Sequence, residues 1–188
     1  MAAQMAIIAD GVNEEQVRRA DFRALFRSHF RFVCVTLRRL GVRDSDVEDV
    51  AQEVFVSVHR KLDSYDATRP LELWLFGFCL RTASTYRRLA RHTRLVHEET
   101  DVEIAHSEPL ADDQIAAEQN RRMVLAALDA IDNDRRAVFV MHDLNEFPAS
   151  QIAEMLALPV NTVYSRLRLA REEFRKAVFR IRAAQGSR

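Results

Sequence analysis

The stretch Leu158-Pro159-Val160-Asn161-Thr162-Val163-Tyr164-Ser165-Arg166-Leu167-Arg168-Leu169-Ala170-Arg171 decides how this chain is interpreted, because it has the pattern of a tight turn followed by an amphipathic helix. Val163, Leu167 and Ala170 recur at helical spacing and predict one buried stripe. Asn161 is placed to cap this helix, since its side-chain oxygen can accept a hydrogen bond from the first turn. The outer sides then carry hydroxyls, an aromatic ring and guanidinium groups, namely Thr162, Tyr164, Ser165, Arg166 and Arg168.

A shorter helix is predicted just before this stretch, over residues 148–156, with Ile152 and Met155 on its apolar face. Ala153 is small enough for a second helix to cross closely. Two short helices joined by a tight turn are typical of a helix-turn-helix, whose second helix reads the major groove of DNA. The spacing fits an ordinary helical hairpin with a solvated basic face equally well, so the pattern alone does not decide for DNA binding.

The composition indicates an all-α protein. Glycine and proline are rare, with 4 of each among 188 residues, and apolar residues recur at helical rather than alternating spacing. The formal net charge is zero, but this total conceals a basic end. From residue 160 onward only Glu172 and Glu173 oppose the many cations, whereas residues 97–119 contain no lysine or arginine. A locally basic segment attracts phosphate even in a neutral chain.

Several classes of protein are not expected. Cys34 and Cys79 lie far apart in apolar patterns, which favours buried thiols over a disulfide or a metal site. The sequence has no nucleophile motif and no glycine-rich phosphate loop, so we expect neither an enzyme nor a cofactor. Residues 1–12 lack the basic start of a signal peptide, and no apolar run is long enough to span a bilayer. We therefore expect a cytoplasmic protein without membrane insertion.

The first half predicts three helical segments, over about residues 14–40, 45–62 and 70–94. Gly41 suits the end of the first helix, and the arginines of that helix, including Arg38 and Arg39, are interpreted as a solvated face. The third segment begins apolar and becomes basic, with hydroxyls and a tyrosine. That change fits a core helix that emerges into solvent, and it also suits single-stranded nucleic acid. We expect two small helical domains, at 13–95 and 114–184, joined by an acidic flexible linker at 96–113, with the helix-turn-helix in the second.

Motifs in both halves together resemble the sigma-70 family of bacterial transcription initiation factors, and most closely its small extracytoplasmic-function (ECF) group. The first half contains Asp46-Val47-Glu48-Asp49-Val50-Ala51-Gln52-Glu53-Val54-Phe55, then Trp74-Leu75-Phe76-Gly77 and Arg87-Arg88. The second half contains Gln151-Ile152-Ala153-Glu154 and then residues 162–171. Each motif alone is weakly specific, but their order and their separation by an acidic linker make the resemblance specific.

The resemblance implies partners for each domain. The first domain would bind core RNA polymerase through Asp49, Gln52, Glu53 and Phe55. It would also hold the minus-ten strand of promoter DNA through Arg69, Trp74, Arg81, Thr85, Tyr86, Arg87 and Arg88. The second domain would read the minus-thirty-five element through Asn161, Thr162, Tyr164, Ser165, Arg166, Arg168 and Arg171. An anti-sigma factor is a further partner that the resemblance implies.

Two residues depart from the family pattern. Arg81 stands where the family usually has asparagine, and Thr85 where it often has aspartate, so a minus-ten sequence preference is not carried over. These departures leave open a sigma-like decoy or adaptor that binds polymerase or an anti-sigma factor without opening DNA. The other alternative is an ordinary helix-turn-helix regulator, which gives no role to residues 49–55 or 74–88.

Overall fold

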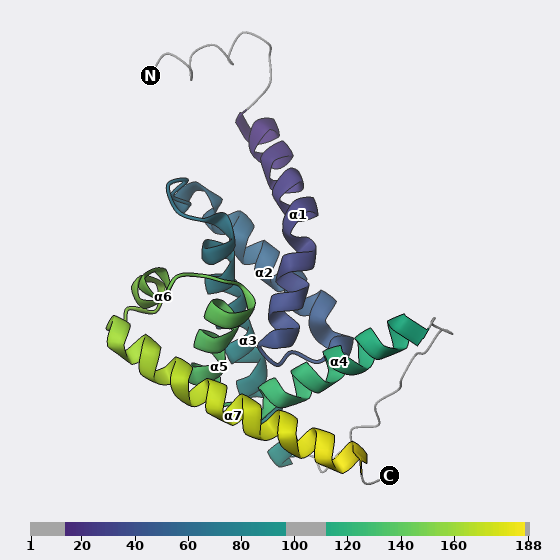
Figure 1. Ribbon diagram of the computed structural model, residues 1–188. Helices are drawn as coiled ribbons and strands as arrows, with labels where there is room; N and C mark the ends of the chain where they lie inside the picture. Colours follow the sequence, from purple (N-terminus) through teal and green to yellow (C-terminus); the bar gives the residue numbers. More distant parts are fainter. Residues whose placement is uncertain (1–13, 97–111, 187–188) are drawn as a thin grey trace.

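The computed structural model describes residues 14–96 and 112–186, and within these ranges the chain is all-α and contains no strand. The predicted linker lies outside the described residues except at its two ends. Figure 1 shows two groups of helices. The first group contains α1 (Glu14–Arg39), α2 (Val47–Lys61) and α3 (Leu71–Val96), and the second contains α4 (Asp112–Asp129), α5 (Asn133–Phe139), α6 (Ala149–Leu156) and α7 (Val160–Gly186). The prediction of an all-α fold is confirmed.

The first domain is a three-helix bundle built on amphipathic stripes. Val47, Val54 and Val58 of α2 are fully buried against α1 and α3, whereas Val56 on the other side of the helix is 50% exposed. Short 3₁₀ turns at Asp44–Asp46 and Leu62–Ser64 flank α2. Cys34 and Cys79 are free, buried thiols, as predicted. Burial raises the pKa of both thiols, so they remain protonated core residues at neutral pH.

The end of α1 is a Schellman motif. The backbone N–H of Val42 donates to the Leu37 carbonyl at 3.1 Å, and that of Gly41 donates to the Arg38 carbonyl at 3.0 Å. Gly41 has φ of +93°, a conformation that glycine adopts without steric penalty. The predicted stop at Gly41 is therefore confirmed.

The second domain packs α4, α5 and α6 against the long helix α7, which runs along one edge of the molecule in Figure 1. A π-helical segment, Val140–Leu144, continues α5. The buried stripe of α7 consists of Val163, Leu167 and Ala170, all at most 2% exposed. Ile152 and Ala153 of α6 complete the helix-turn-helix core. Full burial of an aliphatic side chain contributes about 1.5–3 kcal/mol, so this stripe fixes how α7 lies on the domain.

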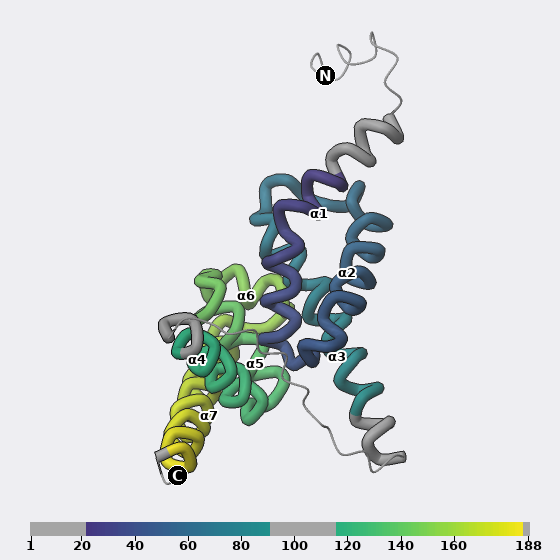
Figure 2. The backbone as a smooth tube through the Cα atoms, turned by 90° about the vertical axis from the view of Figure 1, so that its right-hand side faces the viewer, coloured from purple at the N-terminus to yellow at the C-terminus, as the bar shows by residue number. Residues whose placement is uncertain are grey.

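The two domains contact each other, as the view in Figure 2 also shows. Their buried residues form one continuous apolar cluster. At the junction, the rings of Phe76 in α3 and Phe147 after the π-helical segment meet edge to face, with centroids 6.4 Å apart. The sequence alone did not indicate how the two domains are arranged.

Candidate functional site

The turn of the helix-turn-helix is built from backbone hydrogen bonds. Helix α6 ends in a second Schellman motif, in which Leu158 N–H donates to the Ala153 carbonyl at 2.9 Å. Ala157 takes the left-handed position, with φ of 51° and ψ of 47°. The Pro159 carbonyl then accepts from Thr162 N–H at 2.9 Å, so α7 begins at Val160. The prediction that Asn161 caps this helix is wrong, because Asn161 lies inside the first turn.

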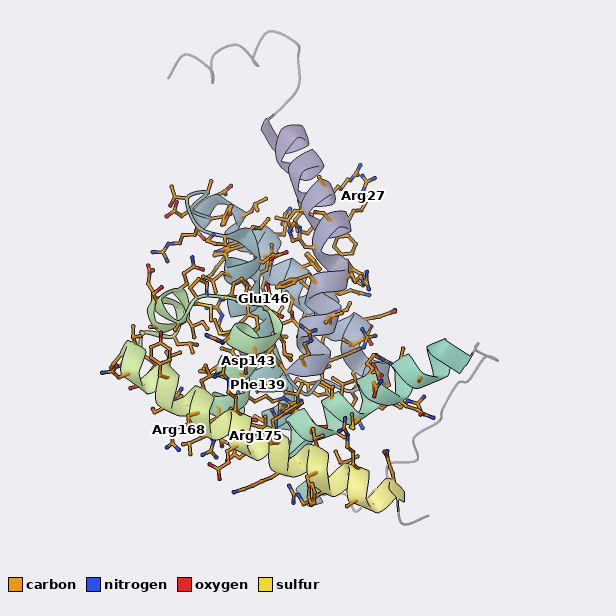
Figure 3. The ribbon with its side chains drawn as sticks, in the orientation of Figure 1. Arg27, Phe139, Asp143, Glu146, Arg168 and Arg175 are labelled. Carbon is orange, nitrogen blue, oxygen red and sulfur yellow. The ribbon has the colours of Figure 1, made fainter. Side chains whose placement is uncertain are left out.

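The outer face of α7 presents an exposed set of side chains. Tyr164 is 55% exposed. Asn161, Ser165 and Arg168 are also exposed, and in Figure 3 Arg168 projects from the outer side of α7. Arg168 makes no hydrogen bond or ion pair within the described part of the chain. This face therefore offers amide, phenol and guanidinium groups to a ligand without prior rearrangement, whereas the Ser165 hydroxyl donates to the Thr162 carbonyl at 2.9 Å.

The other two arginines of the predicted reading set are held by acids of their own domain. Arg166 donates to Asp134 at 3.0 Å. Arg171 donates through Nε and Nη2 to the two carboxylate oxygens of Asp143, both at 2.7 Å. Partial burial alone would raise the pKa of Asp143, but hydrogen bonds from Arg171 and His142 outweigh it and hold that pKa below its ordinary value. Arg171 thus braces α7 against the π-helical segment.

A second polar surface follows helix α3 away from its apolar start. The Arg81 guanidinium stacks on the Phe78 ring, 4.8 Å from its centroid. Trp74 lies between Phe78 and Tyr65, with ring centroids 4.8 Å and 5.0 Å away. Thr85 and Arg88 are exposed farther along the helix. Aromatic rings beside exposed cations are the combination that binds a single strand by stacking and phosphate contact.

Three other residues of the predicted minus-ten set have partners within the protein. Tyr86 donates to Asp46 at 2.5 Å, and partial burial together with Asp46 raises its pKa. Arg87 donates to the Leu40 carbonyl at 3.3 Å. Arg69 pairs with Glu154 of the second domain at 2.6 Å. These three side chains must rearrange before they can contact DNA.

A third surface is the acidic outer face of α2. Asp49, Gln52 and Glu53 are exposed there, at the N-terminal part of the helix. Phe55 is only 2% exposed, so it belongs to the core. It forms part of the wall of a mainly apolar groove of about 370 Å³ together with Phe22, Phe26 and Val56. A partner on this face would meet carboxylates beside an apolar groove.

Neither a metal centre nor a membrane segment is found in the parts of the chain that the structure describes. No group of three or more His, Cys, Asp or Glu side chains there is placed to hold a metal ion. No helix within residues 14–96 or 112–186 is both long and apolar enough to cross a bilayer.

Comparison with known families identifies both domains. The model for sigma-70 region 2 matches residues 25–93, which include all of α2 and most of α1 and α3. The model for sigma-70 region 4 matches residues 121–174, which include the helix-turn-helix. Together they cover more than half of the chain. The chain belongs to the sigma-70 family. The first domain is its region 2 and the second its region 4, so the resemblance expected from the short motifs is confirmed.

Curated relatives match over most of their length. The RNA polymerase sigma factor CnrH of Cupriavidus metallidurans is 29% identical over 157 residues, which cover 80% of this chain and 82% of that protein. The ECF RNA polymerase sigma-E factor of Escherichia coli is 27% identical over 180 residues, covering 88% of this chain and 92% of the relative.

Solved structures share the fold. The sigma factor RpoE of Bartonella quintana, in complex with the anti-sigma factor NepR, has a TM-score of 0.65 at 18% identity, covering 84% of this chain and 96% of that one. CnrH in complex with the cytosolic domain of CnrY has a TM-score of 0.61 at 24% identity, covering 84% and 87%.

The sequence pattern did not single out the acids that hold the arginines of region 4. Asp134 and Asp143 precede their partners by 32 and 28 residues. Only the packing of α5 and the π-helical segment on α7 brings them together. Arg136, which is 1% exposed, was not recognised either. The sequence does contain a signal for its burial, because Arg136 directly precedes the buried residues Ala137 and Val138 in the same short helix.

Proposed function

We propose that this chain is a transcription initiation factor that binds core RNA polymerase and directs it to promoters through the minus-ten and minus-thirty-five elements. The observation that carries the proposal is the presence of regions 2 and 4 of the sigma-70 family on one chain. The role consists of binding rather than catalysis, and it is carried out where the polymerase works, in the cytoplasm. An anti-sigma factor is a further proposed partner, because two structural relatives were solved as complexes.

The residues proposed to contact the minus-thirty-five element fall into two groups, those that face solvent and those already paired within the protein. Asn161, Tyr164, Ser165 and Arg168 face solvent on α7 and are the first candidates for base and phosphate contacts. Thr162, Arg166 and Arg171 are placed around the same turns. Because Arg166 and Arg171 are already paired with carboxylates, they contact phosphate only after exchanging partners.

The proposed polymerase contact is the exposed acidic face of α2. Asp49, Gln52 and Glu53 provide two charges and an amide there, and the neighbouring groove provides apolar area. Phe55 supports this surface from beneath. Complementary charge raises the association rate, and burial of the apolar groove supplies affinity.

The proposed minus-ten contacts lie on α3 and the loop before it. Arg81, Thr85 and Arg88 are exposed, whereas Trp74 is half-buried in its aromatic cluster. The arginine at position 81 favours a phosphate or stacking contact over the amide contact that asparagine would make.

The experiment that tests the proposal is run-off transcription with bacterial core polymerase and a promoter library, read by sequencing the products. We expect promoter-dependent transcripts that decrease about fivefold or more with Arg168→Ala. The paired variant Asp49→Arg/Glu53→Arg is expected to abolish them by loss of polymerase binding. Polymerase binding without transcripts would favour the decoy or adaptor instead, and no polymerase binding would favour the ordinary regulator.

A further inference from the structure

A small cavity of about 130 Å³ lies between the two domains, and three arginines line it. They come from different helices, Arg87 from α3, Arg136 from α5 and Arg166 from α7. Much of the remaining wall is apolar and consists of Leu40, Leu80, Ala83, Ala137 and Leu156. Apolar walls lower the local dielectric, so three guanidinium groups around this space repel one another more strongly than they would in water.

Two of these arginines meet at the C-terminal end of α1. Arg136 donates from Nε to the Arg39 carbonyl at 2.6 Å. Arg87 donates from Nη1 to the next carbonyl, that of Leu40, at 3.3 Å. A Cβ atom added at Gly41 would lie 2.9 Å from Nη1 of Arg136 and 3.3 Å from Cδ of Arg87, so the glycine permits this close approach. A helix C-terminus carries only partial negative charge, so it holds the two cations side by side without neutralising them.

The arginines of α1 itself do not contribute to this cavity. Arg39 was expected to be solvated, but it is half-buried and donates from Nη1 to the side-chain oxygen of Asn145 at 2.8 Å. The neighbouring Arg38 pairs with Asp44 inside region 2. Neither side chain lines the cavity, so its positive charge comes, among the described residues, from the three arginines named above.

Arg136 is short of partners for a buried cation. Its side chain is 1% exposed, and its Nη1 donates to Asp129 at 2.8 Å. Its Nη2 makes no hydrogen bond with any residue in the ranges that the structure describes. Burial lowers the pKa of Arg136, and Asp129 opposes that effect only in part. A buried guanidinium with an unused donor is costly, so this group would gain from an acceptor that brings negative charge.

The other polar groups of the cavity exchange partners at little cost. Arg166 pairs with Asp134 at 3.0 Å, but the carboxylate is 69% exposed, and such exposed pairs contribute little to stability. Asn133 also lines the cavity, and its Oδ1 is buried without a partner among the described residues. Rotation of that amide by half a turn presents an NH₂ donor in place of the oxygen. Ser84 adds an exposed hydroxyl at the edge.

The charges around the cavity determine which ligand fits. Three guanidinium groups against the one carboxylate of Asp134 leave an excess of two positive charges. A terminal phosphate group carries nearly two negative charges at neutral pH and accepts through three oxygens, whereas a carboxylate carries one charge. An engineered cavity of about 150 Å³ holds benzene, so this one has room for a single phosphate group but not for a nucleic-acid strand.

We propose that this cavity binds the terminal phosphate group of a small molecule, either inorganic phosphate or a phosphomonoester, through Arg87, Arg136 and Arg166. Any organic part of the ligand remains at the exposed edge beside Ser84 and Asp134. Because the three arginines come from both regions, bound phosphate stabilises the folded chain as a whole. The site does not depend on the proposed function.

The site is tested by titration calorimetry of the whole chain with inorganic phosphate, with the ionic strength held constant by sodium chloride. We expect one saturable site, and a melting temperature that rises with phosphate at fixed ionic strength. Arg166→Met should weaken phosphate binding about tenfold, because it removes a charge-assisted hydrogen bond. Arg168→Met, at an exposed position of the same helix outside the cavity, should leave the phosphate affinity unchanged. Arg87→Met and Arg88→Met form a second pair with the same expected contrast.

Asp134→Asn provides a variant whose effect a folding defect does not imitate. It removes the one carboxylate among the described residues that lines the cavity and releases Arg166, so the phosphate affinity should rise several-fold. The absence of saturable binding would overturn the site. Equal affinities for Arg166→Met and Arg168→Met would also overturn it and would leave an adventitious ion only.

Adenosine monophosphate distinguishes the two sources of the phosphate group. Binding tighter than that of inorganic phosphate would assign the site to a phosphomonoester, and weaker binding would assign it to the free ion. A single-stranded oligonucleotide without terminal phosphates is the third probe. If it bound more tightly than both and lost affinity with Arg166→Met, the cavity would belong to the DNA backbone and the proposal would be refuted. None of these measurements requires transcription, so the site is judged independently of the proposed function.

Discussion

Arg168 and Arg171 lie three residues apart on α7, yet the structure predicts that replacement by alanine affects promoter binding in one case and stability in the other. Arg168 is exposed and makes no hydrogen bond or ion pair within residues 14–96 and 112–186. Arg171 makes two hydrogen bonds of 2.7 Å to Asp143, whose side chain is 19% exposed. We expect Arg168→Ala to weaken promoter binding without changing stability, and Arg171→Ala chiefly to destabilise region 4.

The magnitudes follow from these environments. Arg171→Ala leaves a mostly buried carboxylate without its main partner, which costs about 1–2 kcal/mol after allowance for the half-exposed guanidinium. For a chain of this size the melting temperature should decrease by roughly 3–6 °C. Arg168→Ala should change the free energy of unfolding by less than about 0.5 kcal/mol. Its loss should weaken promoter binding by about 1–3 kcal/mol, or roughly 5- to 150-fold.

The two variants are compared by thermal unfolding of the free protein and by binding of reconstituted polymerase to a promoter duplex at fixed salt. Measurements at several salt concentrations separate base from phosphate contacts, because loss of one phosphate contact lowers the slope of log affinity against log salt by about 1. An unfolding curve unchanged by Arg171→Ala, together with lost promoter binding, would refute the assignment of Arg171 as a brace. If Arg168→Ala bound the promoter as tightly as the unchanged protein, the assignment of the outer face of α7 as the DNA-contacting surface would be refuted.

Three further predictions concern the turn, the acid range and the polymerase face. Ala157→Gly removes the backbone strain of an alanine with left-handed angles and should raise the free energy of unfolding in urea by about 0.5–1 kcal/mol. The control Ala126→Gly, at an exposed position inside α4, should instead lower it by about 1 kcal/mol. The folded pKa of Asp143 is depressed, so its pair with Arg171 stabilises fully above about pH 4 and is lost as the pH falls through the folded value. The melting-temperature difference between the unchanged protein and Asp143→Asn should therefore vanish in acid. Asp49→Arg/Glu53→Arg should reduce capture of core polymerase at least tenfold, whereas Glu72→Arg, an exposed acid on α3, should not.

Features that depend on local periodicity could be predicted from the sequence. The buried stripe of α7 and the glycine stop of α1 each depend on residues within a few positions of one another, and both are confirmed. The prediction of a cap at Asn161 was wrong because the helix begins earlier. The Pro159 carbonyl already accepts from the N–H groups of Thr162 and Val163. The left-handed residue of the turn is Ala157 rather than Asn161. Alanine has no preference for this backbone conformation, so the sequence does not indicate it.

The contacts between the domains could not be predicted in the same way. Arg39 and Arg136 are 97 positions apart, and the group that Arg136 contacts is a backbone carbonyl. A carbonyl is present at every residue, so the sequence does not mark which one is left without a partner. Arg39 also lies in an arginine-rich helix in which Arg27 and Arg31 are exposed, and Arg27 points outward in Figure 3. Only the meeting of the two domains distinguishes Arg39 from Arg38.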